Sequence, residues 1–202
     1  MTARKLIISV LLNVLLLSYG WGKPGKPVKS TIVKLENGFT ILRNGQPYFI
    51  KGAGGTSNLE KLKAYGGNSI RTWTPQQADG ILHKAQKLGL TVTLGLNVKT
   101  ERHGFDYDNP VAVAQQKEYI RTIVLKYKDH PALLAWGIGN ELNLHYSNPK
   151  VWDAVNSIAE IIHELDPNHL VTTMLAGVNQ KVIDYIKTRC PALDLIAVPV
   201  YG

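Results

Sequence analysis

Residues 130–141 read HPALLAWGIGNE, a nearly continuous apolar run that ends in an asparagine and a glutamate. Such a run, closed by polar residues, is typical of a parallel strand that is covered on both faces. Similar short runs recur along the chain, each followed by a loop and an amphipathic segment, so that this unit repeats about six times. We therefore expect six parallel strands, at residues 48–52, 68–73, 90–96, 132–139, 170–175 and 194–200.

The segments between these strands carry helix signals. Ser57 with Glu60 three residues later predicts a capping box. A capping side chain before a proline predicts further helix starts at Thr74-Pro75, Asn109-Pro110 and Asn148-Pro149. Apolar residues spaced three and four apart within residues 151–165 predict one stripe that packs against the sheet.

The chain before the first strand predicts a β-hairpin. Residues 40–42 and 48–50 flank Asn44-Gly45, a dipeptide that tolerates the positive φ of a tight turn. Residues 21–38 begin with a run rich in proline and lysine, and we expect them to form an exposed leader without regular structure.

Residues 1–20 have the layout of a secretory signal peptide: two basic residues, a short apolar run and then small residues. The apolar run is shorter than the roughly 20 residues that a membrane span requires, so we expect no stable membrane anchor. The prediction is a secreted or periplasmic protein with a single domain over residues 39–202.

The composition narrows the possible partners. The net charge is +8, but lysine and arginine are spread along the chain, which favours a solvated surface over a nucleic-acid groove. The single cysteine, Cys190, leaves no internal disulfide and no thiolate metal cluster. The oligomeric state is not predicted by any of these features.

Two architectures fit alternating strands and helices: an open doubly wound sheet and a closed (β/α)8 barrel. The glycine-rich residues 52–56 could suggest a phosphate loop, but their spacing matches neither common glycine-rich fingerprint. A tight turn at the end of a strand explains them better.

In a barrel, functional groups stand at the carboxyl ends of the strands. The residues that close the expected strands are unusually polar, and we expect them to meet on one rim. They are Arg71, Asn97, Asn140, Glu141 and Tyr201.

Residues 45–202 resemble the catalytic barrels of clan A glycoside hydrolases, most closely the TIM-barrel domain of glycoside hydrolase family 2. The most specific part of the resemblance is the run at residues 130–141 that ends in Asn-Glu. Supporting parts are YFIKG at residues 48–52, GNSIR at residues 67–71, and Tyr201. The resemblance implies a (β/α)8 fold, of which this sequence contains about six strand-helix units.

The resemblance also implies roles for individual residues. Glu141 would be the general acid and base of a retaining hydrolase of β-linked glycans, and Asn140 would hydrogen-bond the sugar 2-hydroxyl. Arg71 and Tyr201 would hold the nucleophilic carboxylate, although a structural ion pair is an alternative for Arg71. Trp73 and His103 would line the sugar subsite. We expect no cofactor.

The nucleophile of the clan is a glutamate at the end of the seventh strand, so we expect it beyond residue 202, in a longer protein. Two alternatives stay open: a non-catalytic carbohydrate-binding barrel, and a β-glucan transglycosylase. A metal site in the loop at residues 101–108 is a weaker alternative, because His103, Asp106 and Asp108 lack a recognised ligand spacing.

Overall fold

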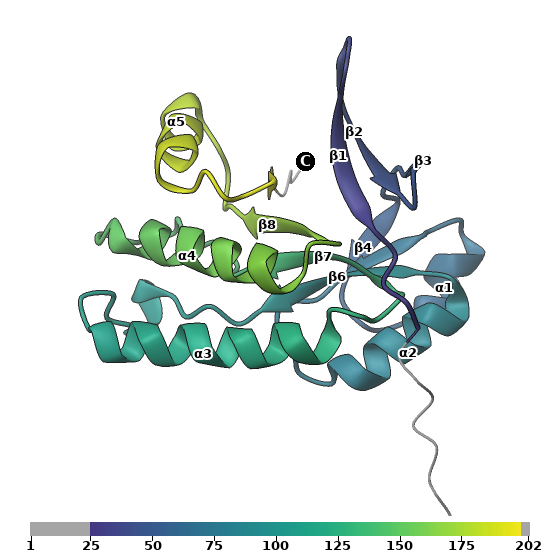
Figure 1. Cartoon of the computed structure of the whole chain (residues 1–202), viewed down its shortest axis with the longest axis horizontal. Coiled ribbons are helices and arrows are strands. Elements are labelled where there is room, and N and C mark those ends of the chain that lie inside the picture. Colours follow the sequence, from purple (N-terminus) through teal and green to yellow (C-terminus); the bar gives the residue numbers. More distant parts are fainter. Residues whose placement is uncertain (1–24, 199–202) are drawn as a thin grey trace, which may run out of the picture.

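The computed structural model describes residues 25–198 and contains two sheets (Figure 1). Six parallel strands follow one another in sequence order, from β4 to β9. They are β4 (Gly52–Gly54), β5 (Ser69–Arg71), β6 (Thr91–Leu96), β7 (Leu133–Ile138), β8 (Leu170–Met174) and β9 (Leu195–Ala197). A doubly wound sheet would reverse its order at one point, so the sequential order is that of a barrel and confirms the predicted fold class.

Helices connect successive strands and cover one face of the sheet (Figure 1). They are α1 (Leu59–Ala64), α2 (Ala78–Leu88), α3 (Pro110–Tyr127), α4 (Lys150–Leu165) and α5 (Gln180–Arg189), with a short 3-10 helix, η1, at Glu101–His103. None of the described helices has the length and apolar character needed to cross a bilayer.

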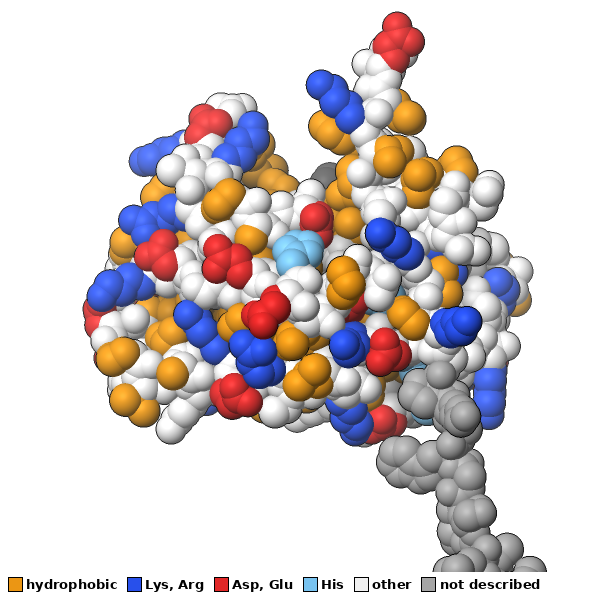
Figure 2. All heavy atoms as spheres, in the orientation of Figure 1, with side chains coloured by type: hydrophobic (Ala, Val, Ile, Leu, Met, Phe, Trp, Pro, Cys, Tyr) orange, Lys and Arg blue, Asp and Glu red, His pale blue; other side chains and the backbone are white. Residues whose placement is uncertain are grey.

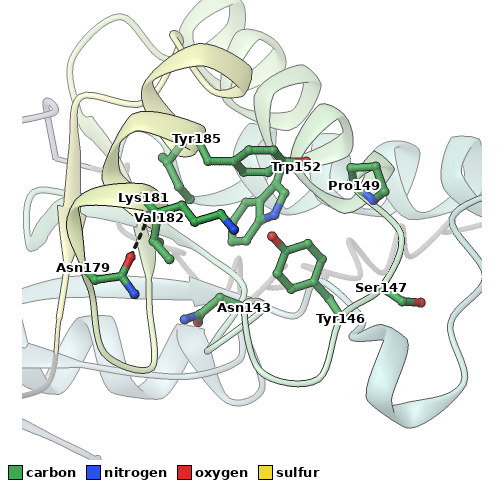
Figure 3. A pocket seen from close by; sticks show the side chains of 10 residues that line it. Asn143, Tyr146, Ser147, Pro149, Trp152, Asn179, Lys181, Val182 and Tyr185 are labelled. Carbon is green, nitrogen blue, oxygen red and sulfur yellow. Dashed lines mark hydrogen bonds between the residues drawn. The ribbon is translucent and has the colours of Figure 1, made fainter.

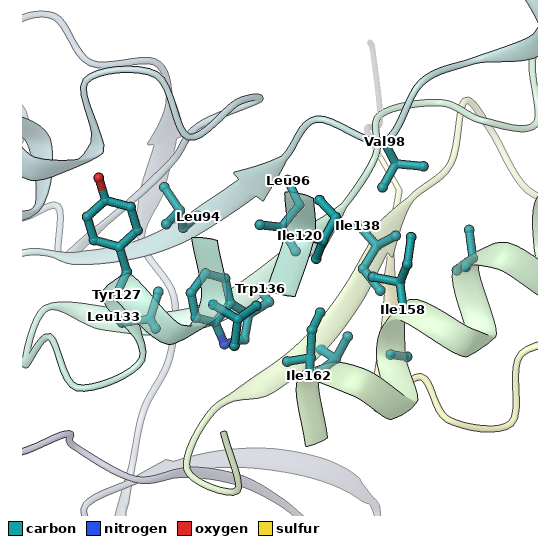
Figure 4. Packing of buried hydrophobic residues seen from close by; sticks show 14 of the residues in the cluster. Leu94, Leu96, Val98, Ile120, Tyr127, Leu133, Trp136, Ile138, Ile158 and Ile162 are labelled. Atoms are coloured by element: carbon teal, nitrogen blue, oxygen red, sulfur yellow. The ribbon is translucent and has the colours of Figure 1, made fainter. Parts of the chain in front are cut away.

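The core lies between the central strands and helices α3 and α4 (Figure 4). Leu94 and Leu96 of β6 and Trp136 and Ile138 of β7 are fully buried there. The predicted apolar stripe of α4 is confirmed, because Ile158, Ile162 and their neighbours on that face are also buried. Each such side chain contributes about 1.5–3 kcal/mol through burial.

The helix starts agree only in part with the sequence signals. Asn109 caps α3 as predicted, since its side chain accepts hydrogen bonds from the amides of Val111 and Ala112. The expected starts at Ser57 and Thr74-Pro75 are wrong. Helices α1 and α2 begin after Asn58 and Gln77, which adopt left-handed φ angles of 54° and 59° and turn the chain into each helix.

The N-terminal hairpin is part of a three-stranded antiparallel sheet. Strands β1 (Ser30–Leu35), β2 (Gly38–Arg43) and β3 (Gln46–Pro47) pair in that order, with Asn44-Gly45 at the predicted turn. The leader predicted over residues 21–38 is therefore wrong in its last part, because β1 pairs with the whole length of β2.

This small sheet contacts the amino ends of the parallel strands. Ser30 donates its amide to the carbonyl of Asn168 before β8, and Arg43 donates to the carbonyl of Pro131 before β7. The hydroxyl of Tyr48 donates to the carbonyl of Asn68, just before β5. These hydrogen bonds attach the small sheet at the end of the barrel opposite to the carboxyl ends of the strands.

A buried polar network also lies near the amino ends. One carboxylate oxygen of Asp166 accepts hydrogen bonds from the indole of Trp136 and from the ring of His169, each at 2.7 Å. Burial alone would raise the pKa of Asp166, but the hydrogen bond and charge interaction with His169, with the bond from Trp136, lower it overall.

Candidate active site

The polar residues that close β5 and β7 meet at the carboxyl ends of the strands. Arg71 is the last residue of β5, and Asn140 and Glu141 follow β7 directly. The guanidinium Nη2 of Arg71 donates to the side-chain oxygen of Asn140 at 2.5 Å, across the intervening strand β6. The prediction that strand ends bring these residues to one rim thus agrees with the geometry for Arg71 and Asn140.

Trp73 forms an exposed wall beside this pair. Its side chain is 46% exposed, and the Arg71 guanidinium lies 5.4 Å from the centre of a Trp73 ring. An aromatic face held by a cation and open to solvent is a surface on which the apolar side of a sugar ring can stack. Trp73 therefore presents an exposed aromatic face beside Arg71 at this rim.

Two glycines make room for this arrangement. Gly95 of β6 and Gly137 of β7 lie opposite each other in the sheet. A methyl group on Gly95 would lie 2.4 Å from the carbonyl oxygen of Thr72, and one on Gly137 would lie 2.9 Å from the Met174 side chain. Because Gly95 has no side chain, the chain after β5 can lie directly over β6, which brings Arg71 and Trp73 toward the end of β7.

The backbone holds Glu141 in an unusual conformation. Its φ is 52°, a left-handed value that few non-glycine residues adopt. The amide of Glu141 donates to the carbonyl of Met174, and its carbonyl accepts from Arg102 at 3.2 Å. The half-buried Glu141 side chain makes no hydrogen bond or ion pair within residues 25–198, which leaves its carboxyl group available to a ligand.

The loops after β6 and β7 are tied together beside Glu141. The carboxylate of Glu101 accepts hydrogen bonds from the amides of Ser147 and Asn148, at 2.9 and 3.0 Å, and from the Ser147 hydroxyl. The hydrogen bond of the Ser147 hydroxyl, followed by the two amides, lowers the pKa of Glu101. Asp108 adds a second link, to Lys150 and Asn148. Sequence reasoning missed these loop contacts, because they join residues about 40 positions apart.

The other predicted site residues are not brought into this group. Asn97 is an exposed residue immediately after β6. The ring of His103 shares a 2.8 Å hydrogen bond with Thr100, within its own loop. Tyr201 lies outside the described residues. Within residues 25–198, no group of three or more acidic, histidine or cysteine side chains could hold a metal ion.

A parallel sheet of this order, with an acid, an amide and a guanidinium at its carboxyl end, places the chain among the (β/α)8-barrel proteins. Residues 58–201 match the family described as "Glycosyl hydrolases family 2, TIM barrel domain". The match covers more than half of the chain, and the chain belongs to glycoside hydrolase family 2. The predicted family is therefore confirmed.

The relatives of this chain include proteins named as mannan endo-1,4-beta-mannosidases. Mannan endo-1,4-beta-mannosidase F of Aspergillus clavatus is 30% identical over 137 residues, which are 59% of this chain and 31% of the relative. Mannan endo-1,4-beta-mannosidase A of Hypocrea jecorina is 33% identical over 131 residues, which are 56% of this chain and 30% of the relative. The chain thus spans about a third of the length of these relatives.

Solved structures share the fold. A beta-D-glucuronidase of Dictyoglomus thermophilum aligns over 84% of this chain and 32% of its own, with a TM-score of 0.61 and 19% identity. A glycosyl hydrolase family 2 member of Bacteroides cellulosilyticus aligns over 84% of this chain and 23% of its own, with a TM-score of 0.64 and 21% identity.

Proposed function

We propose that this barrel is the catalytic domain of a retaining hydrolase of β-linked glycans, with Glu141 as the general acid and base. The observation that carries the proposal is the hydrogen bond between Arg71 and Asn140, next in sequence to Glu141, whose carboxyl group has no partner among the described residues. This pairing supports a site where a sugar is oriented beside a proton donor.

In this mechanism Glu141 protonates the leaving glycosidic oxygen and then removes a proton from the attacking water. Asn140 donates a hydrogen bond to the sugar 2-hydroxyl, a contact that strengthens as positive charge develops on the ring. Its side-chain oxygen is occupied by Arg71, which leaves the amide NH2 group to face the sugar.

The nucleophile is proposed to be a carboxylate on a seventh strand beyond residue 202, held by Arg71 and Tyr201. A retaining mechanism requires the two carboxyl groups to stand about 5–5.5 Å apart. Arg71 donates to Asn140, the residue that precedes Glu141 in the chain, which supports a place for the second carboxylate on the same rim. We also propose that residues 1–20 direct export, and that residues 21–29, the part of the predicted leader before β1, join them to the barrel domain. His103 and Asn97 are proposed to contact the substrate.

Because two relatives are named as mannanases, β-1,4-mannan is the first substrate to assay, with β-1,4-glucan for comparison. In the whole protein that contains this chain, Glu141→Gln should lower turnover of the natural glycan by about 10² to 10⁴. An aryl glycoside with a good leaving group needs no proton, so its first step should lose far less rate.

The matched control is Glu118→Gln, an exposed glutamate on α3, which should leave both rates unchanged. Equal losses on both substrates in Glu141→Gln would argue against the acid role. No turnover of any β-linked glycan would support a carbohydrate-binding barrel, and new linkages in place of free sugar would support a β-glucan transglycosylase.

A further inference from the structure

A cavity that Glu141 does not line is found between the loop after β7 and the start of α5 (Figure 3). It measures about 530 Å³. Its walls include Tyr146 and Trp152 from one side and Lys181 and Tyr185 from the other. Neither Arg71, Asn140 nor Glu141 lines it, so the proposed catalytic group does not explain it.

The cavity contains a buried donor that lacks an acceptor. Trp152 is only 1% exposed, and its indole N–H has no hydrogen-bond partner among the described residues. Figure 3 shows this nitrogen on the side of the ring that faces Lys181 and Tyr146. A buried N–H without a partner costs free energy, and an indole can only donate, so a ligand that satisfies it must bring an acceptor.

The charge of the cavity is positive. Lys181 lines it, and no aspartate or glutamate does. Lys181 also stands in the first turn of α5, where the helix dipole is positive and a cation is unfavourable. The first turn of α5 contains no acidic residue that would offset this repulsion. An anionic ligand would be attracted by both the lysine and the helix end.

Aromatic side chains shape the rest of the cavity. Tyr146 packs edge-on against Trp152, with ring centres 5.5 Å apart. Tyr185 is held from one side by Arg189, whose guanidinium lies 5.5 Å from its ring centre. Aromatic faces of this kind pack against the apolar face of a sugar ring, whereas a small inorganic anion offers nothing to stack.

We propose that this cavity binds a uronic acid residue of a glycan. Its carboxylate accepts hydrogen bonds from Lys181 and from the Trp152 indole, while its ring stacks against the tyrosines. The site does not depend on the proposed hydrolase function, because it needs neither Glu141 nor any bond cleavage. It would let the protein bind acidic branches of a polysaccharide.

The experiment is a titration of the full chain with glucuronate, followed by the indole N–H signals in a ¹H–¹⁵N spectrum. The chain has 4 tryptophans, and the Trp152→Phe spectrum identifies the Trp152 signal by its loss. We expect glucuronate to shift this signal, and to leave the Trp136 signal unmoved because its N–H is bound to Asp166. Glucose should bind at least about tenfold more weakly, since it lacks the charge-assisted contact.

Lys181→Gln should weaken glucuronate binding about tenfold while raising the melting temperature slightly, because the cation no longer opposes the helix dipole. The matched control is Lys187→Gln, an exposed lysine of α5 outside this cavity, which should leave the affinity unchanged. Glu141→Gln should also bind glucuronate normally, which separates this proposal from the hydrolase mechanism.

The proposal would be overturned if glucuronate left the Trp152 signal in place. It would also be overturned if glucose bound as tightly as glucuronate and Lys181→Gln affected neither, since the cavity would then recognise neutral sugars.

Discussion

Gly95 and Gly137 lie opposite each other beneath the candidate site, and Gly95 could not be exchanged for a larger residue without moving the backbone of Thr72 and Trp73. The two predicted residues that meet, Arg71 and Asn140, do so because the backbone of Thr72 and Trp73 can cross over Gly95. The position of Arg71 and Trp73 thus depends on Gly95, a residue without a side chain.

Gly95→Ala should lower the free energy of unfolding by about 1–3 kcal/mol, because its methyl group would meet backbone atoms that cannot rotate away. Urea denaturation measures the change. The control is Gly80→Ala in α2, where the added methyl group meets nothing within 4 Å. That substitution should raise stability by about 0.5–1 kcal/mol, as alanine favours helix. Equal effects would contradict the steric argument.

Asp166→Asn should lower the free energy of unfolding by about 1–3 kcal/mol at pH 7, because one of the two buried acceptor oxygens becomes an NH2 group and the negative charge beside His169 is lost. The folded protein lowers the pKa of Asp166, so its carboxylate stabilises the fold above an unfolded pKa of about 4. That contribution is lost as the pH falls through the lower, folded pKa.

Denaturation curves measured from pH 7 to acid pH test this contribution of the Asp166 carboxylate. The wild-type chain should lose stability in the acid range more steeply than Asp166→Asn does. The control is Asp129→Asn, at an exposed position. It should change the free energy of unfolding by no more than about 0.5 kcal/mol, both at pH 7 and at acid pH. If the free energy of unfolding fell equally with pH in Asp166→Asn and the wild type, the ionised carboxylate of Asp166 would not be the source of this stability.

Among single residues, the sequence predicted those that end strands. Arg71, Asn140 and Trp73 were identifiable because parallel strands bring their carboxyl ends to one edge, which is a property of the fold class. The contacts of Glu101 and Arg102 were not identifiable, since they depend on the paths of two loops. The expected place of His103 in a sugar subsite has no supporting contact, and its ring bonds Thr100 instead.

At the scale of elements, the two loops after β6 and β7 act as one unit. Glu101 in η1 receives the amides of Ser147 and Asn148, and Arg102 beside it donates to the carbonyl of Glu141. The loop that contains Glu141 therefore takes its shape from the preceding loop as well as from its own strand.

Glu101→Ala should speed hydrogen exchange at the Ser147 and Asn148 amides several-fold, because both lose their acceptor. In the whole protein it should also lower turnover more than it raises the Michaelis constant, through displacement of Glu141. The control is Glu118→Ala on the exposed side of α3, for which we expect neither change. Unchanged exchange in Glu101→Ala would show that the loops are held by other contacts.

Acidification gives a second test of the same contact. The folded protein lowers the pKa of Glu101, mainly through the Ser147 hydroxyl, so the loops are joined above the ordinary glutamate pKa of about 4.3. The link weakens as the pH falls through the lowered value. Ser147 resonances should therefore titrate below pH 4.3 in the wild-type chain and not in Glu101→Ala.

Some helix and strand boundaries follow from local sequence signals, and others depend on contacts with distant parts of the chain. The Asn109-Pro110 signal succeeded because the cap is formed by the Asn109 side chain itself, which accepts from the amides of Val111 and Ala112. The Thr74-Pro75 signal failed because Pro75 is buried in a turn in which the Thr74 hydroxyl accepts from the Gln76 amide. The sequence did not predict strand β1, because the leader was assigned from its proline- and lysine-rich beginning. Strand β1 forms through its pairing with β2, which that local composition does not indicate.

At the scale of the molecule, the contacts of the small sheet and the candidate site residues lie at opposite ends of the barrel. The antiparallel sheet of β1, β2 and β3 attaches to the amino ends of the strands, while the candidate residues stand at the carboxyl ends. The overall order of the strands was predictable from the alternation of strands and helices. The way the small sheet attaches was not, because it depends on single side chains such as Tyr48.

Tyr48→Phe should lower the free energy of unfolding by about 0.5–1.5 kcal/mol, because it removes the hydrogen bond to the carbonyl of Asn68. Turnover of the whole protein should stay unchanged, as Tyr48 lies at the opposite end of the barrel. Tyr65→Phe is the control, since Tyr65 is 90% exposed and should give no measurable change. A loss of activity in Tyr48→Phe without a loss of stability would contradict the view that Tyr48 contributes to stability alone.

On the face that Figure 2 shows, lysine and arginine side chains are interspersed with aspartate and glutamate, in keeping with the spread of charge along the sequence.

The attachment of the small sheet has a practical consequence for engineering. A library built on β1, β2 and their turn could be selected for heat tolerance alone, with substrate preference held constant throughout the screen. A second library, on the loops after β6 and β7, could then be built on the most heat-tolerant variant and selected for substrate preference. The gains from the two rounds should add, because the two libraries vary different residues.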